Sequence, residues 1–553
     1  MAEQHVEWNL QIEGMTCDHC ASTLDQALRR VPGVAEAATV YEAGTARVVA
    51  EPRVDAAALE QAVAAKGYRV TASSARPIGS APRSAAPGRP DYALAIVGTG
   101  SAGVAAAIRA AELGATVAII ERGLLGGTCV NIGCVPSKTL IRAAEVAHRA
   151  THHGFVGVRT RVDGVDFGAI VAQKDQLVAE LRKAKYAGVL AGYPSITLLR
   201  GAARFRSDGT LEVAGTPVPA GKYLLATGAS PWAPPIPGLS DTRFLTSTEA
   251  LALQTLPASL VVVGGSAVGL EIAQLYARLG TRVTVLEAQA SLVPAEDAEI
   301  GAALTGYLRD EGIAIETGAA IEHVAGEPGR YRIRTTLASG PRTFEAEQLL
   351  VATGRRPNTR GLGLEEAGIQ LGKKGEVVVD EHLETTRPGV YAAGDTIGDP
   401  AFVYVAAYAG SLAAENALGT NARRYDLSVV PRVTFTDPAI ASVGLTEAQA
   451  RARGVDVAVS RLPMSYVPRA IAARDTRGMV KLVADRATNL LVGAHILAPE
   501  AGDLIQEAVM AIQFGIRVDQ ITTMLHPYLT NAEAMKLACQ TFDKDVAKLS
   551  CCA

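Results

Sequence analysis

Six of the seven cysteines in this chain occur as three close pairs, and this grouping is the clearest sign of its chemistry. The pairs are Cys17 and Cys20 in GMTCDHC, Cys129 and Cys134 in GGTCVNIGCVPSK, and the adjacent Cys551 and Cys552, while Cys539 stands alone. Paired thiolates are ligands that soft metal ions prefer, and a thiol pair beside a redox cofactor suits two-electron chemistry. The pattern predicts a protein that passes a soft metal ion between dithiols and then reduces it.

Length and composition limit the classes of protein that the chain can belong to. At 553 residues it has room for about three to five domains, and its net charge of −3 predicts no nucleic-acid partner. We expect no secretory signal, because no basic stretch followed by an apolar core opens the sequence. The longest uncharged stretch, residues 92–108, is rich in Gly and Ala and shorter than a membrane span of about 20 residues. These features predict a cytoplasmic protein, in which close cysteine pairs bind metal or carry out redox chemistry more often than they staple the fold.

The first pair of cysteines belongs to a small unit over residues 6–71. Its apolar runs and Gly breaks predict the order βαββαβ, and the Pro-, Ser-, Ala- and Gly-rich residues 72–90 predict a flexible linker. Cys17 and Cys20 lie where a loop enters a helix, and a helix N-terminus favours the thiolate. Taken alone, this unit predicts a copper carrier. A structural zinc site is the less favoured alternative, because it needs two more ligands and His19 supplies only one.

Two strand–glycine–helix units follow, each typical of dinucleotide binding. The first has Gly98, Gly100 and Gly103 after an apolar strand, and Glu121 ends the next strand as an acceptor for a ribose hydroxyl. The second has Gly264, Ser266 and Gly269, with Ser in place of the middle glycine, and Glu287 ends its following strand. A carboxylate at that position accepts from a ribose 2′-OH and repels a 2′-phosphate, so Glu287 favours NADH over NADPH.

The second pair of cysteines is separated by five positions. A regular helix would leave their Cα atoms too far apart for a disulfide, whose reach is about 7 Å. The segment must therefore depart from regular helix if the two thiols are to meet, and Gly126, Gly127, Gly133 and Pro136 supply the freedom and the break.

Residues 91–545 resemble the flavin-dependent pyridine-nucleotide disulfide oxidoreductases. The resemblance rests on GGTCVNIGCVPSK, with support from residues 226–228, 352–354 and 391–395. It implies an α/β fold with two Rossmann-like domains, for FAD and for NAD(P)H, an α+β interface domain, and the ferredoxin-like metal-binding unit in front. The implied divisions are FAD 91–257 and 379–427, NAD(P)H 258–378, interface 428–545 and a tail at 546–553. The implied further cofactor contacts are Gly123, Thr128, Lys138, Ala203, Thr227, Gly228, Glu271, Gly354, Asp395 and Val403.

Two features are similar to the mercury(II)-reducing branch of that family, namely the terminal KLSCCA and the heavy-metal-associated unit with GMTCDHC. This resemblance implies that NAD(P)H reduces Hg(II), delivered as thiol complexes, to Hg(0). It implies that Cys551 and Cys552 receive the ion and hand it to Cys129 and Cys134. It also implies a homodimer in which the tail of one subunit serves the other, with Tyr186 and Tyr528 lining the metal site.

Two alternatives stay open on the sequence. His526-Pro527 resembles the disulfide-reducing members, where a Glu five residues later holds the acid–base His; here that position is Asn531, and the Glu is at 533. A dihydrolipoamide dehydrogenase-like disulfide reductase is therefore one alternative, supported by Glu287 and His526. The other is a copper-carrier fusion that uses only its first cysteine pair. We expect His526 to be a packing or tuning residue and Cys539 to be a buried thiol.

Overall fold

The computed structural model describes residues 5–13, 18–40, 44–78 and 91–548. The chain forms two compact units, Met1–Pro90 and Asp91–Ala553, and each is described by itself. Three of the predicted metal-binding cysteines, Cys17, Cys551 and Cys552, lie outside the described residues. No helix in the described ranges is both long and apolar enough to cross a membrane.

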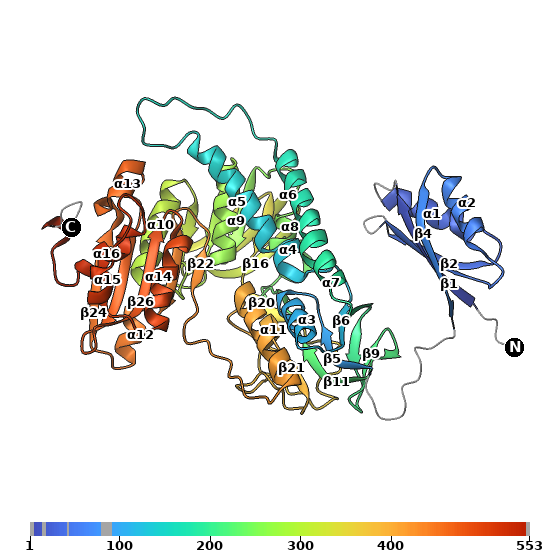
Figure 1. The fold of residues 1–553 in the computed structure, drawn as a ribbon. Coiled ribbons are helices and arrows are strands. Elements are labelled where there is room, and N and C mark those ends of the chain that lie inside the picture. Colours follow the sequence, from blue (N-terminus) through green and yellow to red (C-terminus); the bar gives the residue numbers. More distant parts are fainter. Residues whose placement is uncertain (1–4, 14–17, 41–43, 79–90, 549–553) are drawn as a thin grey trace. The chain divides into compact units, whose positions relative to one another are not determined.

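The first unit has the predicted βαββαβ order (Figure 1). Its elements are β1 (His5–Glu13), α1 (Asp18–Arg29), β2 (Val34–Val40), β3 (Thr45–Ala50), α2 (Ala56–Ala64) and β4 (Arg69–Ile78). The antiparallel sheet has the order β2-β3-β1-β4, and its core includes Leu10, Leu24 and Leu59. Strand β4 continues to Ile78, seven residues beyond the expected end at Thr71, because it pairs with β1 as far as His5. The Pro-, Ser-, Ala- and Gly-rich composition from residue 72 onward had predicted a linker there.

The second unit begins with a five-stranded parallel sheet of order β21-β11-β5-β6-β7. The strands are β5 (Tyr92–Val97), β6 (Val117–Glu121), β7 (Ile196–Arg200), β11 (Ala220–Leu225) and β21 (Val390–Ala392). Helices α3 (Ser101–Glu112) and α11 (Val403–Leu418) pack on one face through small residues; a Cβ on Gly410 would lie 2.0 Å from the Ala102 carbonyl oxygen. The other face carries the small sheet β8 (Ala203–Phe205), β9 (Leu211–Val213) and β10 (Thr216–Pro217). Since β21 and α11 come late in the chain, the chain leaves this domain and returns to it.

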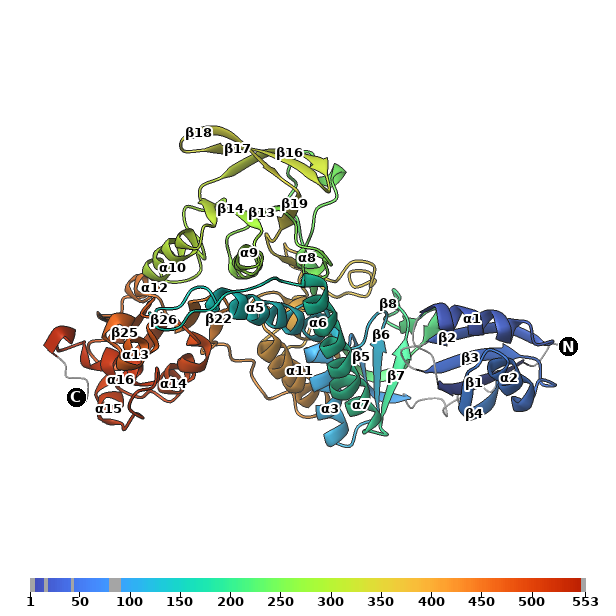
Figure 2. The ribbon, with the colours of Figure 1, turned by 90° about the horizontal axis from the view of Figure 1, so that it is seen from above.

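The excursion between β11 and β21 forms a second parallel sheet, with the order β15-β14-β13-β19. Its strands are β13 (Ser259–Val263), β14 (Arg282–Leu286), β15 (Ala314–Glu316) and β19 (Gln348–Val351), with helices α9 (Ala267–Arg278) and α10 (Ala298–Asp310). Strand β13 is buried along its whole length, as is typical of parallel strands covered on both faces. The antiparallel strands β16 (Ala320–Glu327), β17 (Arg330–Leu337) and β18 (Gly340–Ala346) cover one face, as Figure 2 shows. Short strands β12 (Ala229–Pro231) and β20 (Arg355–Pro357) pair where the chain crosses between the two domains.

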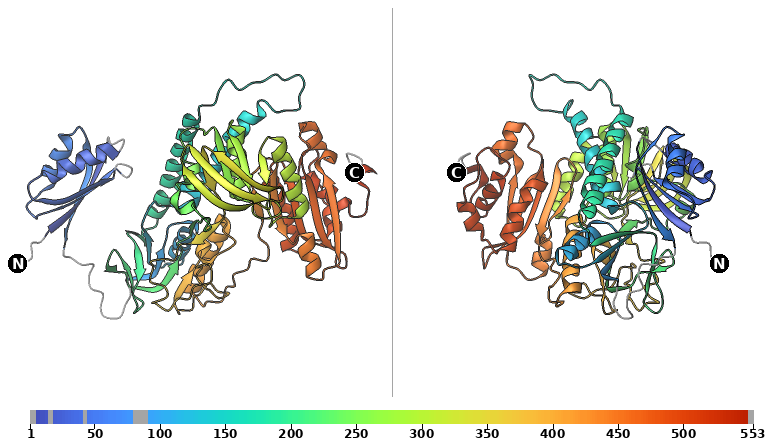
Figure 3. Two further views of the ribbon diagram at one scale, coloured as in Figure 1. Left: turned by 180° about the vertical axis from the view of Figure 1, so that it is seen from behind. Right: turned by 45° about the vertical axis from the view of Figure 1, so that its right-hand side comes forward.

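The C-terminal part is built on a five-stranded antiparallel sheet of order β22-β23-β26-β25-β24, drawn in orange and red in Figures 1 and 3. The strands are β22 (Arg432–Thr434), β23 (Ala439–Gly444), β24 (Val457–Pro463), β25 (Met479–Asp485) and β26 (Leu490–Ala498). The helices are α12 (Glu447–Ala452), α13 (Pro468–Ala473), α14 (Ala501–Gln513), α15 (Val518–Thr523) and α16 (Glu533–Gln540). Cys539 is 3% exposed on α16, which agrees with the buried thiol predicted from the sequence.

Helices that follow the first glycine turn carry the second cysteine pair. They are α4 (Gly127–Ile132), α5 (Cys134–Arg149), α6 (Phe167–Arg182), the π-helical turn η1 (Lys183–Ala187) and α7 (Gly188–Ala191). Residues 150–166, between α5 and α6, have no regular structure and arc outward in Figure 1. His152 and His153 lie at the start of this segment, and His148 lies in the last turn of α5 just before it.

A buried group of ions joins the second parallel sheet to the C-terminal domain. The side chain of Arg278 on α9 is 4% exposed and donates to Glu311 at 2.6 Å and to Asp437 at 3.0 Å. Arg477 donates to the same Asp437 at 2.9 Å. These contacts hold the end of α9 against the start of β23, and the side chains of Glu311 and Asp437 are only 10% and 13% exposed, so removing a cation would leave a nearly buried carboxylate unpaired.

We expect Arg278→Met to lower the free energy of unfolding by about 3–5 kcal/mol, because it leaves carboxylates buried without their main cation. Denaturant unfolding followed by circular dichroism measures the change. Arg332→Met is the matched control: its partner Glu345 and Arg332 itself are more than half exposed, so its removal should cost within about 0.5 kcal/mol. Equal costs for the two variants would contradict a structural role for the buried group.

Candidate active site

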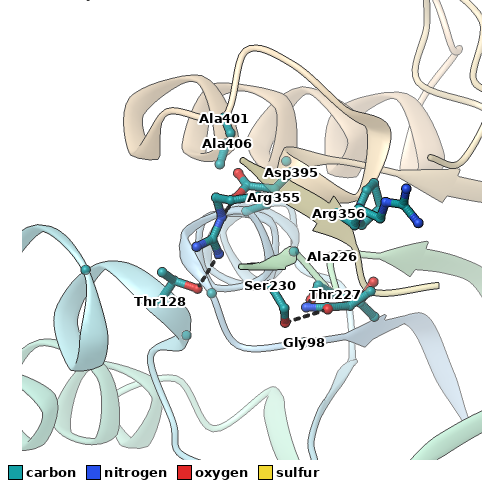
Figure 4. A pocket seen from close by; sticks show the side chains of 18 of the residues that line it. Gly98, Thr128, Ala226, Thr227, Ser230, Arg355, Arg356, Asp395, Ala401 and Ala406 are labelled. Carbon is teal, nitrogen blue, oxygen red and sulfur yellow. Dashed lines mark hydrogen bonds and ion pairs between the residues drawn. The ribbon is translucent and has the colours of Figure 1, made fainter. Parts of the chain in front are cut away.

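A cavity of about 1390 Å³ opens at the carboxyl ends of β5 and β6. Segments far apart in the sequence line it, including Gly100 of the first glycine turn and both Cys129 and Cys134. Figure 4 shows two more of them, Gly98 and Asp395. Other predicted cofactor residues in the lining are Glu121, Thr128, Lys138, Ala203, Thr227, Gly228, Glu271 and Val403. The fold therefore brings the predicted nucleotide turn and the predicted redox pair to one site.

The glycine turn has the close approaches that a dinucleotide cradle requires. Gly98 has φ +112°, and a Cβ on it would lie 2.2 Å from the Ala226 carbonyl oxygen. Gly127 has φ +63°, and a Cβ there would lie 2.6 Å from the Cα of Gly100. Helix α3 begins after Gly100 without a side-chain cap, so its first N–H groups face the cavity mouth unused. Such an uncapped helix N-terminus fits a pyrophosphate, and the residues present fit FAD.

The strand-end acid of the first unit is held by its own loop. Glu121 accepts the N–H of Gly123 at 2.7 Å and the N–H and hydroxyl of Thr99. These bonds orient the carboxylate toward the cavity that it lines. Gly123 thus acts on the carboxylate through its backbone and does not itself line the cavity.

Arg355 is a residue of the cavity that the sequence analysis missed. Its guanidinium lies 3.8 Å from the Asp395 carboxylate and donates to Thr128 and to the Ala229 carbonyl (Figure 4). Burial lowers the pKa of Arg355 and raises the pKa of Asp395. The predicted Gly354 does not line the cavity; it accepts the N–H of Trp232 at 3.0 Å and so places the next residue. The sequence did contain a signal for Arg355, because it directly follows residues 352–354, which resemble a nucleotide contact of the family.

The two thiols meet because the helix is interrupted between them. Helix α4 ends at Ile132, α5 begins at Cys134, and Gly133 between them has φ −124° and ψ −110°. The predicted departure from regular helix is confirmed. Both thiols are free in this structure, with Cys134 the more exposed of the two.

A hydrogen bond between the thiols separates their acidities. It lowers the pKa of Cys134 to about 7, assisted by the positive charge of Lys138, while burial opposes the shift. The same bond is the main cause that raises the pKa of Cys129. Cys134 therefore carries the thiolate and Cys129 keeps the proton that it donates.

Lys138, on α5, contacts side chains from two other parts of the fold at the site. Its ammonium on α5 is 2.5 Å from the Glu271 carboxylate of α9 and 4.4 Å from the ring centre of Phe435. The other oxygen of Glu271 accepts the N–H of Phe435 at 2.9 Å. The cation near the thiolate is thus positioned by both neighbouring domains.

The two predicted tyrosines have different positions. Tyr186 lies in η1, where its ring packs on Gly126, and burial followed by the charge of the nearby Cys129 raises its pKa, while Ser101 opposes the shift. π-Helical turns are frequent at functional sites. Tyr528 is 54% exposed in the turn after α15; neither tyrosine is among the residues that line the cavity, but the charge of Cys129 acts on Tyr186. A single chain brings Tyr186, but not Tyr528, to the thiol pair.

The second glycine turn lies outside this cavity, which reaches α9 only at Val268, Glu271 and Ile272. Ser266 is the residue before α9 and makes no side-chain cap, while a Cβ on Gly269 would lie 2.0 Å from the Gly264 carbonyl oxygen. Glu287 accepts the N–H of Gly265 at 2.6 Å and that of Gln289 at 2.7 Å. The turn keeps a free helix N-terminus, and Glu287 is a preorganised acceptor beside it.

His526 has a carboxylate partner that sequence spacing could not identify. Its Nε2 lies 2.8 Å from Oε1 of Glu507, on α14, while Nδ1 lies 3.2 Å from the Met524 carbonyl oxygen. The two positions that the sequence analysis considered, Asn531 and Glu533, do not fill this role; Glu533 is 7% exposed at the start of α16. The partner comes from a helix earlier in the chain, so only the tertiary fold pairs them.

Comparison with known families agrees with this site. Residues 92–410 match the family described as pyridine nucleotide-disulphide oxidoreductase, residues 430–539 match its dimerisation domain, and residues 9–69 match the heavy-metal-associated domain. The chain therefore belongs to the pyridine nucleotide-disulphide oxidoreductase family.

Curated relatives place the chain within this family more narrowly. It is 43% identical to the mercuric reductase of Staphylococcus aureus, over 99% of each chain. It is 49% identical to that of Streptomyces lividans, over 84% of this chain and 98% of the other. These likenesses place it in the mercuric reductase branch.

Solved structures show the same fold. The HOCl-induced flavoprotein disulfide reductase RclA from Escherichia coli is 32% identical, with a TM-score of 0.74, over 81% of this chain and 99% of the other. LpdA from Mycobacterium tuberculosis is 31% identical, with a TM-score of 0.71, over 81% and 98%.

The thiol acidities can be measured directly. In reduced protein we expect iodoacetamide to alkylate Cys134 with a midpoint near pH 7, and Lys138→Met to move that midpoint upward, because it removes a charge that favours the thiolate. Peptide mass spectrometry separates the cysteines. Cys539 is an internal control that should stay unmodified, because burial raises its pKa to about 12. An unchanged midpoint in the variant would show that Lys138 does not act on the thiolate.

Proposed function

We infer that this chain reduces Hg(II) to Hg(0) with NAD(P)H, in a flavin-dependent reaction that serves mercury detoxification. The balanced reaction is NAD(P)H + Hg²⁺ → NAD(P)⁺ + H⁺ + Hg⁰, in which two electrons pass to the metal and one proton is released. The observation that carries this proposal is the thiol pair in the wall of a cavity that fits FAD. The near full-length likeness to mercuric reductases supports the choice of metal.

The residues that would hold FAD are those that form the cavity. The uncapped start of α3 faces a pyrophosphate, Glu121 accepts from a ribose, and Arg355 with Asp395 forms a buried pair near the thiols. FAD supplies, when bound, the two-electron link between the nicotinamide and the metal. Partial burial of Arg355 reduces the screening of its charge by water, so the charge acts more strongly on groups in the cavity.

The thiol pair binds the ion by exchanging ligands. Cys129, which the family resemblance gives as the exchanging thiol, displaces one thiolate ligand of the incoming ion, and that ligand takes the Cys129 proton and leaves as a free thiol. Cys134, already a thiolate near pH 7, displaces a second thiolate and becomes the other protein ligand. Lys138 favours the thiolate through its positive charge, and Tyr186 lies beside Cys129 on the protein side. Thiolate exchange lets a tightly held ion move without being released.

Delivery of the ion is assigned to the terminal thiols, which lie outside the described residues. We place Cys551 and Cys552 as the pair that takes Hg(II) from thiol complexes and passes it to Cys129 and Cys134 of a second subunit. Exposed apolar and aromatic side chains of the C-terminal domain support a second copy as the partner: Phe514 is 72% exposed, Leu525 is 97% exposed and Tyr528 is 54% exposed. Cys17 and Cys20 would add to the local supply of ion, and the cytoplasm would keep all these thiols reduced.

One assay separates the proposal from its alternatives. The purified protein should carry a flavin spectrum and should oxidise NADH or NADPH when given Hg(II) in excess thiol, with release of Hg(0) vapour. Lipoamide as acceptor tests for a disulfide reductase, which the His526–Glu507 pair favours. Copper ions test for a carrier without reductase activity. Turnover with lipoamide and none with Hg(II) would overturn the proposal.

Variants of the terminal cysteines and a variant of Cys134 should lose Hg(II) turnover under different conditions. We expect Cys551→Ser with Cys552→Ser to keep flavin reduction by NADPH but to lose at least about tenfold in Hg(II) turnover when excess thiol competes for the ion. Cys134→Ser should abolish turnover with every ligand, because it removes the thiolate in the cavity. Cys17→Ser with Cys20→Ser is the matched control, with much smaller loss. Full turnover by the tail variant in excess thiol would show that the terminal pair is not the entry site.

The choice of nicotinamide cofactor should depend on the loop after β14. Glu287 offers a carboxylate, and residues 287–297 contain no Lys or Arg that could bind a 2′-phosphate. We expect NADH to be used efficiently, and Ala288→Arg to raise the ratio of kcat/KM for NADPH over NADH at least about tenfold. This variant leaves the two backbone bonds to Glu287 intact. Ala290→Arg, two positions further along the exposed loop, tests how local the effect is, and steady-state rates with both cofactors measure it. An unchanged ratio in Ala288→Arg would show that this loop does not contact the ribose.

A further inference from the structure

One part of the wall of the FAD cavity carries positive charges that the proposed reaction does not use. Among the described residues, seven Lys or Arg side chains line this cavity against four Asp or Glu side chains, although the whole chain has a net charge of −3. Three of these cations, Arg360, Lys373 and Lys374, come from the segment between β20 and β21, and all three are exposed. We call these three residues the cationic rim.

Hydrogen bonds keep the members of the cationic rim together. Its two lysines occupy the centre of a tight turn, in which the N–H of Gly375 donates to the Gly372 carbonyl at 3.0 Å. Gly375 has φ +85°, in the left-handed region that favours glycine. The hydroxyl of Thr359, a buried residue, donates to the Gly375 carbonyl at 2.7 Å. Because Thr359 directly precedes Arg360, this bond holds the lysine turn beside the arginine.

The rim cations have no carboxylate of the protein to neutralise them. In the described part of the chain none of the three forms an ion pair, whereas Lys138 of the same cavity pairs with Glu271 at 2.5 Å and Arg355 lies 3.8 Å from Asp395. Cations held close together repel one another, and an anion that binds among them relieves the repulsion. The rim therefore attracts anions, over a range of about 8–10 Å at moderate ionic strength.

We propose that the cationic rim attracts the pyrophosphate of FAD and speeds the entry of the cofactor into its cavity. The pyrophosphate is anionic at pH 7, and a cleft lined by one sign of charge raises the local concentration of the opposite charge and the rate of association. The start of α3, whose first N–H groups are uncapped, then holds the pyrophosphate in place. This inference rests on the fit of the cavity to FAD, and it assigns to the rim the rate of binding.

The rate at which FAD enters the full-length protein tests the rim. Flavin is released from the holoprotein in bromide, and circular dichroism checks that the apoprotein stays folded. Stopped-flow mixing with FAD then follows the change in flavin fluorescence. At low ionic strength we expect Arg360→Gln with Lys373→Gln and Lys374→Gln to lower the association rate constant at least about fivefold. The difference should shrink in about 0.5 M salt, because salt screens exposed charges.

A matched control removes the same number of charges elsewhere. Arg282→Gln with Arg330→Gln and Arg453→Gln changes three exposed arginines that do not line the cavity. Within the described ranges these arginines form no ion pair, as in the rim. The control should therefore take up FAD at the rate of the parent, since only the position of the lost charges differs between the two triple variants.

The parent alone supplies a second measurement, which needs no substituted protein to fold. Its association rate with FAD should fall as salt rises from about 0.02 M to about 0.5 M. A rate that does not depend on salt, a parent-like rate in the rim variant, or equal slowing in both triple variants would overturn the proposal.

NADPH also carries a pyrophosphate, so its KM is measured with each holoprotein. A rim variant with a raised KM for NADPH and an unchanged rate of FAD entry would assign the rim to the nicotinamide cofactor and overturn the proposal. All of these readouts concern cofactor binding. A protein that takes up FAD through the rim and yet does not reduce Hg(II) would refute the proposed function alone.

Discussion

The hydrogen bond between Cys129 and Cys134 is the contact on which the chemistry of this fold depends. It exists because Gly133 breaks the helix between them, and it divides one proton between two thiols so that Cys134 is the more acidic. Without Cys129 and Lys138 the pKa of Cys134 would be higher, since burial acts in the opposite direction. The buried Cys539 shows that outcome: burial, with a smaller contribution from the charge of Glu507, raises its pKa to about 12.

The surroundings of that pair come from three separate parts of the fold. The cation belongs to α5, the carboxylate that positions it to α9, and the aromatic ring beneath it to the segment before β23. The buried ions around Arg278 hold the same two domains together further along α9. Small shifts between the domains would therefore move the Lys138 ammonium relative to the thiolate. The reason is that contacts with other elements, and not α5 alone, hold that side chain in place.

Most of the architecture was predictable from local patterns. Apolar strands followed by glycine turns predicted the two dinucleotide-binding units, and the apolar runs and Gly breaks of residues 6–71 predicted the βαββαβ unit, because each pattern has its own period and its own breaks. The end of β4 was misjudged, since Ser and Ala residues form a strand there only through their pairing with β1. The resemblance to a family carried the assignments of Tyr186 and Lys138, which isolated residues could not have supported.

The sequence by itself determined the ligand chemistry: cysteine pairs, glycine turns and strand-end acids are local features whose spacing limits what they can bind. Only the tertiary structure decided which of these features share a site. It placed Arg355 beside Asp395, paired His526 with Glu507, and left Tyr528 away from the thiols of its own chain. The physical reason is that such contacts join elements far apart in the chain. Their partners are chosen by the packing of sheets and helices, and no spacing in the sequence records that choice.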